Sequence, residues 1–403
     1  MLKKIIFSFQ ANFVVAVITL VISLITAKFL GSYGRGYLSI IAIYIALVQL
    51  INDILGVGVV FFLLKRYQVN EIVFISYVWF LFVTTIGTLI LTHIGLIGIQ
   101  FKYVFFLNVL SASIFALNLR ILINKVKIKW YNMLVILQPL IVFILLYLKG
   151  FSDFSIKDFL IFQGVSYMIP SAFSILLLMN EFKEQFRVFV IKDLIKESFK
   201  LGIINQGANF SQIVNYRVSF FFIEKYEGLK AVGVFSVLFS FANVIWLFAV
   251  TVGTLLGNEV SKSDKLNGGS IAQFSNYIKI TLIFTFILII GIYLLPSQVY
   301  VDLLNKDFYQ IKRLLLLLSP AIIIFSSAKV LGYFFSSQGK MKINFYASLA
   351  GLIPSIVLGY ILIKEFKIYG AILTCSISFI LSSFILGYFF WKESENSQNH
   401  LIK

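Results

Sequence analysis

The sequence predicts an all-α, polytopic membrane protein with about twelve transmembrane helices in two six-helix lobes around a central cavity. Of the 403 residues, 60% are hydrophobic and only 13% are charged, whereas soluble domains carry about 25% charged residues. So much apolar surface needs a lipid environment, which excludes a soluble multidomain enzyme and a disordered chain. Apolar runs of about 20 residues, the length that spans a bilayer, also recur along the whole chain.

These runs are predicted to be transmembrane helices. Their approximate spans are 5–27, 37–64, 71–92, 103–123, 130–148, 156–179, 200–223, 231–257, 275–295, 314–336, 343–363 and 369–391. The second run is long, so we expect it to tilt or to extend beyond the hydrocarbon. The start of the chain resembles a signal peptide. However, its apolar run is too long and lacks a clear cleavage site, so it is interpreted as the first helix.

The distribution of basic residues predicts the orientation. If the N-terminus is cytoplasmic, the inner segments hold 20 lysines and arginines and the outer segments hold 12. This bias places both termini in the cytoplasm. The net charge of +17 is therefore assigned to topology and to anionic membrane lipids, and we expect no nucleic-acid partner.

A polar connection near the middle of the chain divides the predicted helices six and six. Charged and apolar residues alternate in it, which is typical of an amphipathic helix at the cytoplasmic interface. The sequence thus predicts an N-terminal lobe, an amphipathic linker, a C-terminal lobe and a cytoplasmic tail. Their respective residues are 1–180, 181–199, 200–391 and 392–403.

A weak internal repeat relates the two halves. A shift of 197 residues aligns six identities, which are Lys28 with Lys225, Gly31 with Gly228, Gly36 with Gly233, Ser39 with Ser236, Leu50 with Leu247, and Gly56 with Gly253. The glycines predict two turns and one close-packing point within a helix at matching positions. Because the offset spans six helices, it preserves orientation and indicates a parallel repeat.

Three ionisable residues lie inside predicted membrane helices: Asp53, Arg217 and Lys329. Each costs about 2.5–3.5 kcal/mol near the bilayer centre, so it needs a partner, a wet cavity or a function. Arg217 lies beside a polar stripe with helical spacing, formed by Asn205, Asn209, Gln212 and Tyr216. One face of that helix should therefore line water or protein.

We interpret Arg217 and Lys329 as holding an anionic headgroup, because guanidinium and ammonium groups suit phosphate oxygens. The alternatives are that one of them pairs with Asp53 or snorkels to a membrane surface. Asp53 is also a candidate for proton or sodium coupling. The further substrate-binding candidates are Asn209, Gln212, Tyr216, Lys28 and Arg120.

Two of the basic residues have a plainer interpretation. Lys28 and Arg35 flank the first outer loop, where they suit ordinary interfacial anchors, and Arg120 lies where lipid phosphate or an entering substrate would pass. No cofactor, catalytic residue or metal site is expected. Cys375 is the only cysteine, and His93 and His400 show no ligand spacing.

Several motifs resemble those of Wzx-type polysaccharide flippases. The segment 27–37 (AKFLGSYGRGY) followed by 53–58 (DILGVG) resembles the opening of that family. Residues 233–236 (GVFS), the stretch 303–309, the loop 337–340 (SQGK) and 368–371 (IYGA) are similar to later family motifs. The resemblance covers nearly the whole chain, although this sequence has few charges in the membrane helices of its first lobe.

The resemblance places the chain in the multidrug, oligosaccharidyl-lipid and polysaccharide (MOP) export superfamily, whose members alternate between inward- and outward-open states. It implies a flippase of the bacterial cytoplasmic membrane that moves an undecaprenyl-diphosphate-linked oligosaccharide for O-antigen or capsule biosynthesis. A polysaccharide polymerase is then a candidate partner. The cationic cavity of the family maps best onto Arg217 and then onto Lys329.

Three alternatives remain open. A multidrug exporter of the same superfamily should carry acidic residues in its cavity, and here the membrane helices hold one acid and two bases. A polyprenyl-linked polymerase or glycosyltransferase needs positioned acids, and the longest outer loop offers only Asp302 and Asp307. A peptidoglycan-precursor flippase generally has two further helices.

Overall fold

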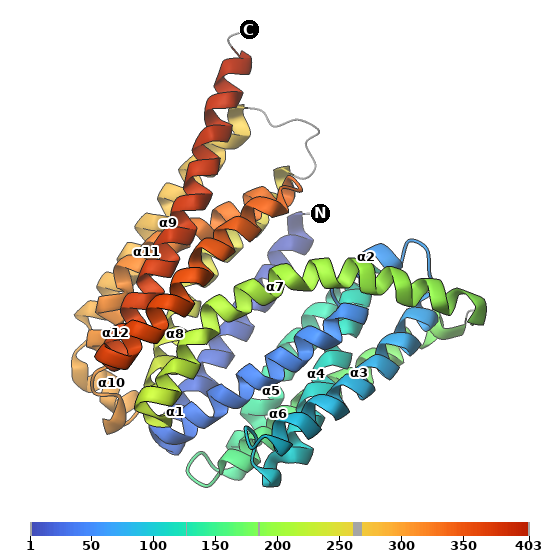
Figure 1. Cartoon of the computed structure of the whole chain (residues 1–403), viewed down its shortest axis with the longest axis horizontal. Coiled ribbons are helices and arrows are strands. Elements are labelled where there is room, and N and C mark those ends of the chain that lie inside the picture. The colour runs from blue at the N-terminus through green and yellow to red at the C-terminus, as the bar shows by residue number, and fades with distance from the viewer. Residues whose placement is uncertain (1, 126, 184–185, 261–267, 402–403) are drawn as a thin grey trace. The chain divides into compact units, whose positions relative to one another are not determined.

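The computed structural model describes residues 2–125, 127–183, 186–260 and 268–401, and within these the chain is helical and contains no strand (Figure 1). The α-helices are α1 (Leu2–Asn52), α2 (Val60–Leu63), α3 (Val69–His93), α4 (Lys102–Asn124), α5 (Ile128–Lys149), α6 (Ile156–Leu178), α7 (Ile191–Glu227), α8 (Leu229–Val260), α9 (Gly268–Leu294), α10 (Ser297–Leu303), α11 (Ile311–Ser337) and α12 (Met341–Leu401). Five 3₁₀ turns join them: η1 (Asp53–Leu55), η2 (Ile99–Phe101), η3 (Met179–Lys183), η4 (Val188–Val190) and η5 (Lys306–Phe308).

Two of these helices each contain two segments. α1 is interrupted at Gly31 and α12 at Lys367, where the backbone leaves the helical region. Within the described residues, α3 to α9 contribute seven long helices, α11 one and the halves of α1 and α12 four, twelve in all. Nine described stretches are long and apolar enough to cross a membrane. The predicted class, an all-α multi-pass membrane protein, is confirmed.

The helix ends follow from the sequence. Capping boxes begin α3 at Gln68 and α6 at Ser155, where the side chain of the third helical residue bonds back to the cap. Gly150 follows α5 with φ 94°, and Gly339 follows α11 with φ 72°. These backbone angles favour glycine and stop a helix.

The predicted helix over 37–64 is wrong in its second part, because α1 ends at Asn52. The chain then forms η1 and the short α2, so the predicted continuous run is broken. The broken turn is held by α3: the Ser76 hydroxyl donates to the Leu55 carbonyl at 2.6 Å. Gly56 allows this packing, since a Cβ there would lie 2.7 Å from the Phe80 ring. The average hydropathy of the run does not reveal the break, because apolar residues surround Asp53, Gly56 and Gly58 on both sides.

The chain forms two compact units. The first comprises Met1–Ile22 and Leu38–Phe210, and the second comprises Ser23–Tyr37 and Ser211–Lys403. The segment of residues 23–37, named the outer segment after its predicted side of the membrane, belongs to the second unit although it precedes most of the first. The lobe boundaries predicted at residues 180 and 200 stay a prediction.

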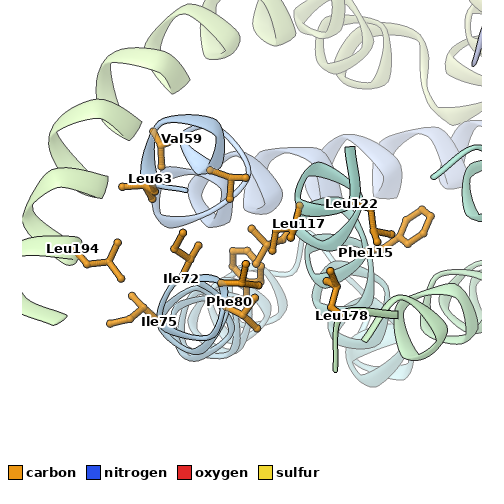
Figure 2. Close-up of a cluster of buried hydrophobic side chains, with 14 of the residues drawn as sticks. Val59, Leu63, Ile72, Ile75, Phe80, Phe115, Leu117, Leu122, Leu178 and Leu194 are labelled. Carbon is orange, nitrogen blue, oxygen red and sulfur yellow. The ribbon is translucent and has the colours of Figure 1, made fainter. Parts of the chain in front are cut away.

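An apolar cluster forms part of the core of the first unit (Figure 2). It joins Val59 and Leu63 after the break to Ile72 and Phe80 of α3, and Leu194 at the start of α7 packs into it. Within the described part of residues 181–199, the chain forms η3 and η4, and an α-helix begins at Ile191 and continues as α7. Leu194 packs on protein, and the interpretation of the segment as an amphipathic linker stays a prediction.

Ion pairs fasten this linker to the first unit. The fully buried Glu71 carboxylate accepts from Arg187 Nε at 2.7 Å and Nη2 at 2.9 Å, and from the Arg187 main-chain N–H at 3.3 Å. Lys125 bonds Glu181 at 2.8 Å, and Arg66 bonds Glu197 at 2.8 Å. The connection is thus held at three points along its length.

Replacing Arg187 by alanine should lower the free energy of unfolding by about 3 kcal/mol, because it leaves the buried Glu71 carboxylate without its ionic partner. Thermal unfolding of the purified protein measures the change. Arg66→Ala is the matched control, since Arg66 is 70% exposed and an exposed ion pair contributes about 1 kcal/mol or less. Equal melting temperatures for the two variants would contradict this assignment.

In the second unit, α11 packs on α8, α9 and α12. The outer segment joins this unit through Gly36 and Gly233. A Cβ on Gly36 would lie 1.9 Å from the Leu229 carbonyl oxygen, and one on Gly233 would lie 1.9 Å from the Ser32 carbonyl oxygen. The shift of 197 residues that relates Gly36 to Gly233 also relates Ser32 to Leu229, so this contact is reciprocal.

The repeat glycines behave partly as predicted. Gly31 and Gly228 have φ of 68° and 89°, so the predicted turn is confirmed at both positions. The second predicted turn, at Gly36 and Gly233, is wrong: both glycines lie in helices whose backbones touch. The close-packing point is confirmed in α8, where a Cβ on Gly253 would meet Tyr333 at 2.7 Å.

Candidate functional site

Arg217 lies half-buried on α7 in the second unit. Its guanidinium carbon sits 5.5 Å from the centre of the Phe220 ring. Among the residues that the structure describes, no carboxylate lies within ion-pairing distance of it. A charge held in an apolar helix bundle by an aromatic face alone is suited to meet an anion.

Lys329 lies half-buried on α11, over two aromatic rings. Its Nζ is 5.4 Å from the Trp246 ring centre and 5.0 Å from that of Phe325. The buried Trp246 indole N–H donates to the Ile322 carbonyl at 3.1 Å, which fixes the ring against α11. The sequence alone does not single out Trp246, because an aromatic residue in an apolar run does not show which side chain it will contact.

One aromatic cluster connects the two cations. It consists of Phe220, Phe235, Phe239, Trp246, Phe325 and Phe379. Phe220 packs edge-on against Phe239 at 6.0 Å, Phe239 contacts Trp246 at 6.4 Å, and Trp246 contacts Phe325 at 5.3 Å. Since ring faces attract cations, both side chains rest on members of the same cluster.

Arg35 of the outer segment lies in the same unit. Its Nε donates to Ser236 Oγ at 3.2 Å, Nη1 to Thr26 Oγ1 at 3.2 Å and Nη2 to Ser240 Oγ at 3.4 Å. The interpretation of Arg35 as an interfacial anchor missed this placement, although the repeat glycine beside it, Gly36, was a signal of close packing.

Lys28 contacts the loop before α11. It is exposed, and its Nζ donates to the main-chain carbonyl of Asp302 at 2.9 Å, while its own carbonyl accepts from Asn305 Nδ2 at 3.3 Å. These contacts fasten the outer segment to the loop before α11. They give Lys28 a structural task within the second unit.

Asp53 and Arg120 lie in the first unit. Asp53 begins η1 at the end of α1, and its carbonyl accepts from the Gly56 and Gly58 N–H groups at 3.4 and 3.3 Å. Arg120 is exposed on α4, and its positive charge acts on the Asp53 carboxyl. The structure thus brings these two candidates together in one unit and Arg217, Lys329 and Lys28 in the other.

The polar stripe of α7 is described only in part. The side chains of Asn205, Asn209, Gln212 and Tyr216 lie outside the described residues. The neighbouring Asn215 is buried and accepts from Ser355 Oγ and Ser378 Oγ, both at 2.7 Å. At least this part of α7 faces protein, because α12 supplies both hydroxyls.

Known proteins share this architecture. The MatE family model matches residues 207–361. The lipid II flippase MurJ, in an inward closed conformation, superposes with a TM-score of 0.78 at 17% identity, over 99% of this chain and 92% of that chain. The MATE transporter VcmN from Vibrio cholerae superposes with a TM-score of 0.67 at 11% identity, over 98% of this chain and 95% of that chain. No curated protein sequence matches the chain.

A third similar structure is that of a MOP superfamily transporter from Pyrococcus furiosus. It is described as having a binding pocket of reverse polarity that suggests a different function. Its TM-score is 0.61 at 12% identity, over 98% of this chain and 96% of that chain. The chain therefore has the fold shared by the lipid II flippase MurJ and the MATE transporters of the MOP superfamily.

Proposed function

We propose that this protein is a flippase that moves an undecaprenyl-diphosphate-linked oligosaccharide from the inner to the outer leaflet of the bacterial cytoplasmic membrane. The observation that carries the proposal is the placement of Arg217 and Lys329 on one aromatic cluster of the second unit. Cations kept inside an apolar bundle favour an anionic cargo. The similarity to a lipid II flippase supports a lipid-linked one.

In this mechanism the diphosphate enters from the inner leaflet and is bound by Arg217 and Lys329. Charge-assisted hydrogen bonds to phosphate oxygens offset the cost of keeping both cations in the membrane. The glycan crosses through a polar passage while the lipid tail stays in the bilayer. Rocking between inward- and outward-open states completes the transfer. Asn209, Gln212 and Tyr216 remain candidates for lining this passage, and Asp53 for ion coupling.

The MATE similarity keeps a multidrug exporter as the alternative. A pump for cationic drugs should present carboxylates where this site presents Arg217 and Lys329. For the Pyrococcus furiosus transporter, the reverse polarity of the binding pocket is described as suggesting a different function. The positive charge of Arg217 and Lys329 therefore favours an anionic cargo over a cationic drug.

The membrane-enzyme alternative is weakened by the outer loop. The Asp307 carboxylate accepts from the Ser32 main-chain N–H at 3.1 Å and from its hydroxyl at 2.8 Å. The Asp302 carboxylate accepts from Gln298 Nε2 at 2.9 Å. Each aspartate is engaged in local structure, which is a poor arrangement for general acid–base catalysis.

Binding to the purified full-length protein tests the choice of cargo. We expect calorimetry to show saturable binding of a short-chain polyprenyl diphosphate and much weaker binding of a lipophilic cation such as ethidium. The corresponding polyprenyl alcohol is the matched control and should not bind, because it lacks the diphosphate. Saturable ethidium binding without diphosphate binding would overturn the proposal in favour of the drug exporter.

A further inference from the structure

We propose that Arg35 is a third cation of the anion site and acts together with Arg217 on the same diphosphate. This inference rests on the proposed function and adds to its site a residue from the outer segment, residues 23–37. Three features of the second unit support it: the way in which the segment is fixed, the hydroxyl groups that orient Arg35, and the nearness of Arg217.

The outer segment is a fixed part of the second unit. The reciprocal contact of Gly36 and Gly233 brings its main chain against the start of α8 without intervening side chains. Ser32 adds two hydrogen bonds to Asp307. A side chain on this segment therefore has a defined position relative to α8, as a binding residue requires.

Three hydroxyls orient the Arg35 guanidinium. Thr26, Ser236 and Ser240 each accept one hydrogen bond from a different nitrogen of the group. Each hydroxyl gives its own proton to a main-chain carbonyl three or four residues earlier, so its lone pairs face Arg35. This arrangement fixes the plane of the guanidinium while its hydroxyl partners add no negative charge.

Arg217 approaches the same part of α8. Its ring partner Phe220 packs on Phe235 at 5.1 Å and on Phe239 at 6.0 Å. Those two residues directly precede Ser236 and Ser240, which bind Arg35. Arg35 therefore contacts this stretch of α8 directly, and Arg217 contacts it through Phe220. Two guanidinium groups placed along one stretch of helix suit the oxygens of a diphosphate, which match the planar donors of arginine.

Binding of two probes to the full-length protein tests this inference. The probes are inorganic pyrophosphate and farnesyl diphosphate, which separate free phosphate from a lipid headgroup. We expect Arg35→Gln to weaken farnesyl diphosphate about tenfold to a hundredfold, the range for hydrogen bonds to charged groups. Lys312→Ala is the matched control, because it removes a basic residue of the same unit whose Nζ also donates to a main-chain carbonyl, that of Leu295, and it should bind as the wild type does.

A double-variant cycle shows whether the two arginines share one anion. If they do, Arg35→Gln should cost much less affinity in an Arg217→Ala background than in the wild type. Arg35→Lys, which keeps the charge but loses the planar donors, should bind more weakly than the wild type and more tightly than Arg35→Gln. Wild-type affinity in Arg35→Gln, with binding lost in Arg217→Ala, would overturn the role of Arg35 and leave the proposed function standing. Failure of the wild type to bind farnesyl diphosphate would overturn the proposed function itself.

Discussion

Replacing Gly233 by alanine is expected to prevent the second unit from folding correctly. The added Cβ would lie 1.9 Å from the Ser32 carbonyl oxygen and 2.7 Å from the carbonyl carbon. Both are main-chain atoms, so no side-chain rotation relieves the overlap, and α8 or the outer segment must move. We expect the free energy of unfolding to fall by more than about 4 kcal/mol, among the largest effects of single substitutions. Size-exclusion profiles and melting temperatures of the purified protein measure it.

Gly36→Ala should behave in the same way, because its Cβ would lie 1.9 Å from the Leu229 carbonyl oxygen. Gly291→Ala is the matched control, since Gly291 lies in α9 with nothing within 4 Å of an added Cβ. That substitution should be neutral or should stabilise the helix by up to about 1 kcal/mol. A Gly233→Ala protein that melts like Gly291→Ala would show that the two backbones do not touch.

Arg217→Ala is expected to abolish export of the lipid-linked glycan while leaving the protein inserted and abundant. The guanidinium rests on the Phe220 ring and has no carboxylate partner among the described residues, so its removal should disturb the cargo more than the fold. The measurement is complementation of a flippase-null strain, read as surface polysaccharide, with membrane abundance followed in parallel.

A conservative variant and a control variant test this interpretation further. Arg217→Lys keeps the charge but not the bidentate geometry, so it should retain partial export. Lys312→Ala should export normally, because Lys312 bonds the Leu295 main-chain carbonyl in the loop region before α11. Normal surface polysaccharide in Arg217→Ala cells would remove Arg217 from the mechanism.

Much of the fold could be predicted because membrane insertion is governed by the length and hydropathy of each run. The break after Asn52 could not, since it depends on contacts that Leu55 and Gly56 make with α3. The packing of Leu194 could not be predicted either, because an apolar residue gives the same signal whether it faces lipid or a protein core.

The candidate site could be predicted from the sequence at the positions where a single charge interrupts an apolar helix. Arg217 and Lys329 stand out because burying a cation in a membrane helix is costly. Arg35 did not stand out, since a basic residue beside an outer loop is ordinary, and its meeting with α8 depends on the contact of Gly36 with Gly233. Trp246 was missed because its place under Lys329 is a property of two helices together.

The membership of residues 23–37 in the second unit has a consequence for dissecting the molecule. If the chain is cut at the central linker, the C-terminal fragment lacks this segment. The main chain around Leu229 and Gly233 is then uncovered. A split version that retains both pieces should therefore reassemble around a short stretch donated by the other fragment, in the manner of strand or helix complementation. The segment itself, supplied as a peptide, is the natural reagent for isolating the second unit.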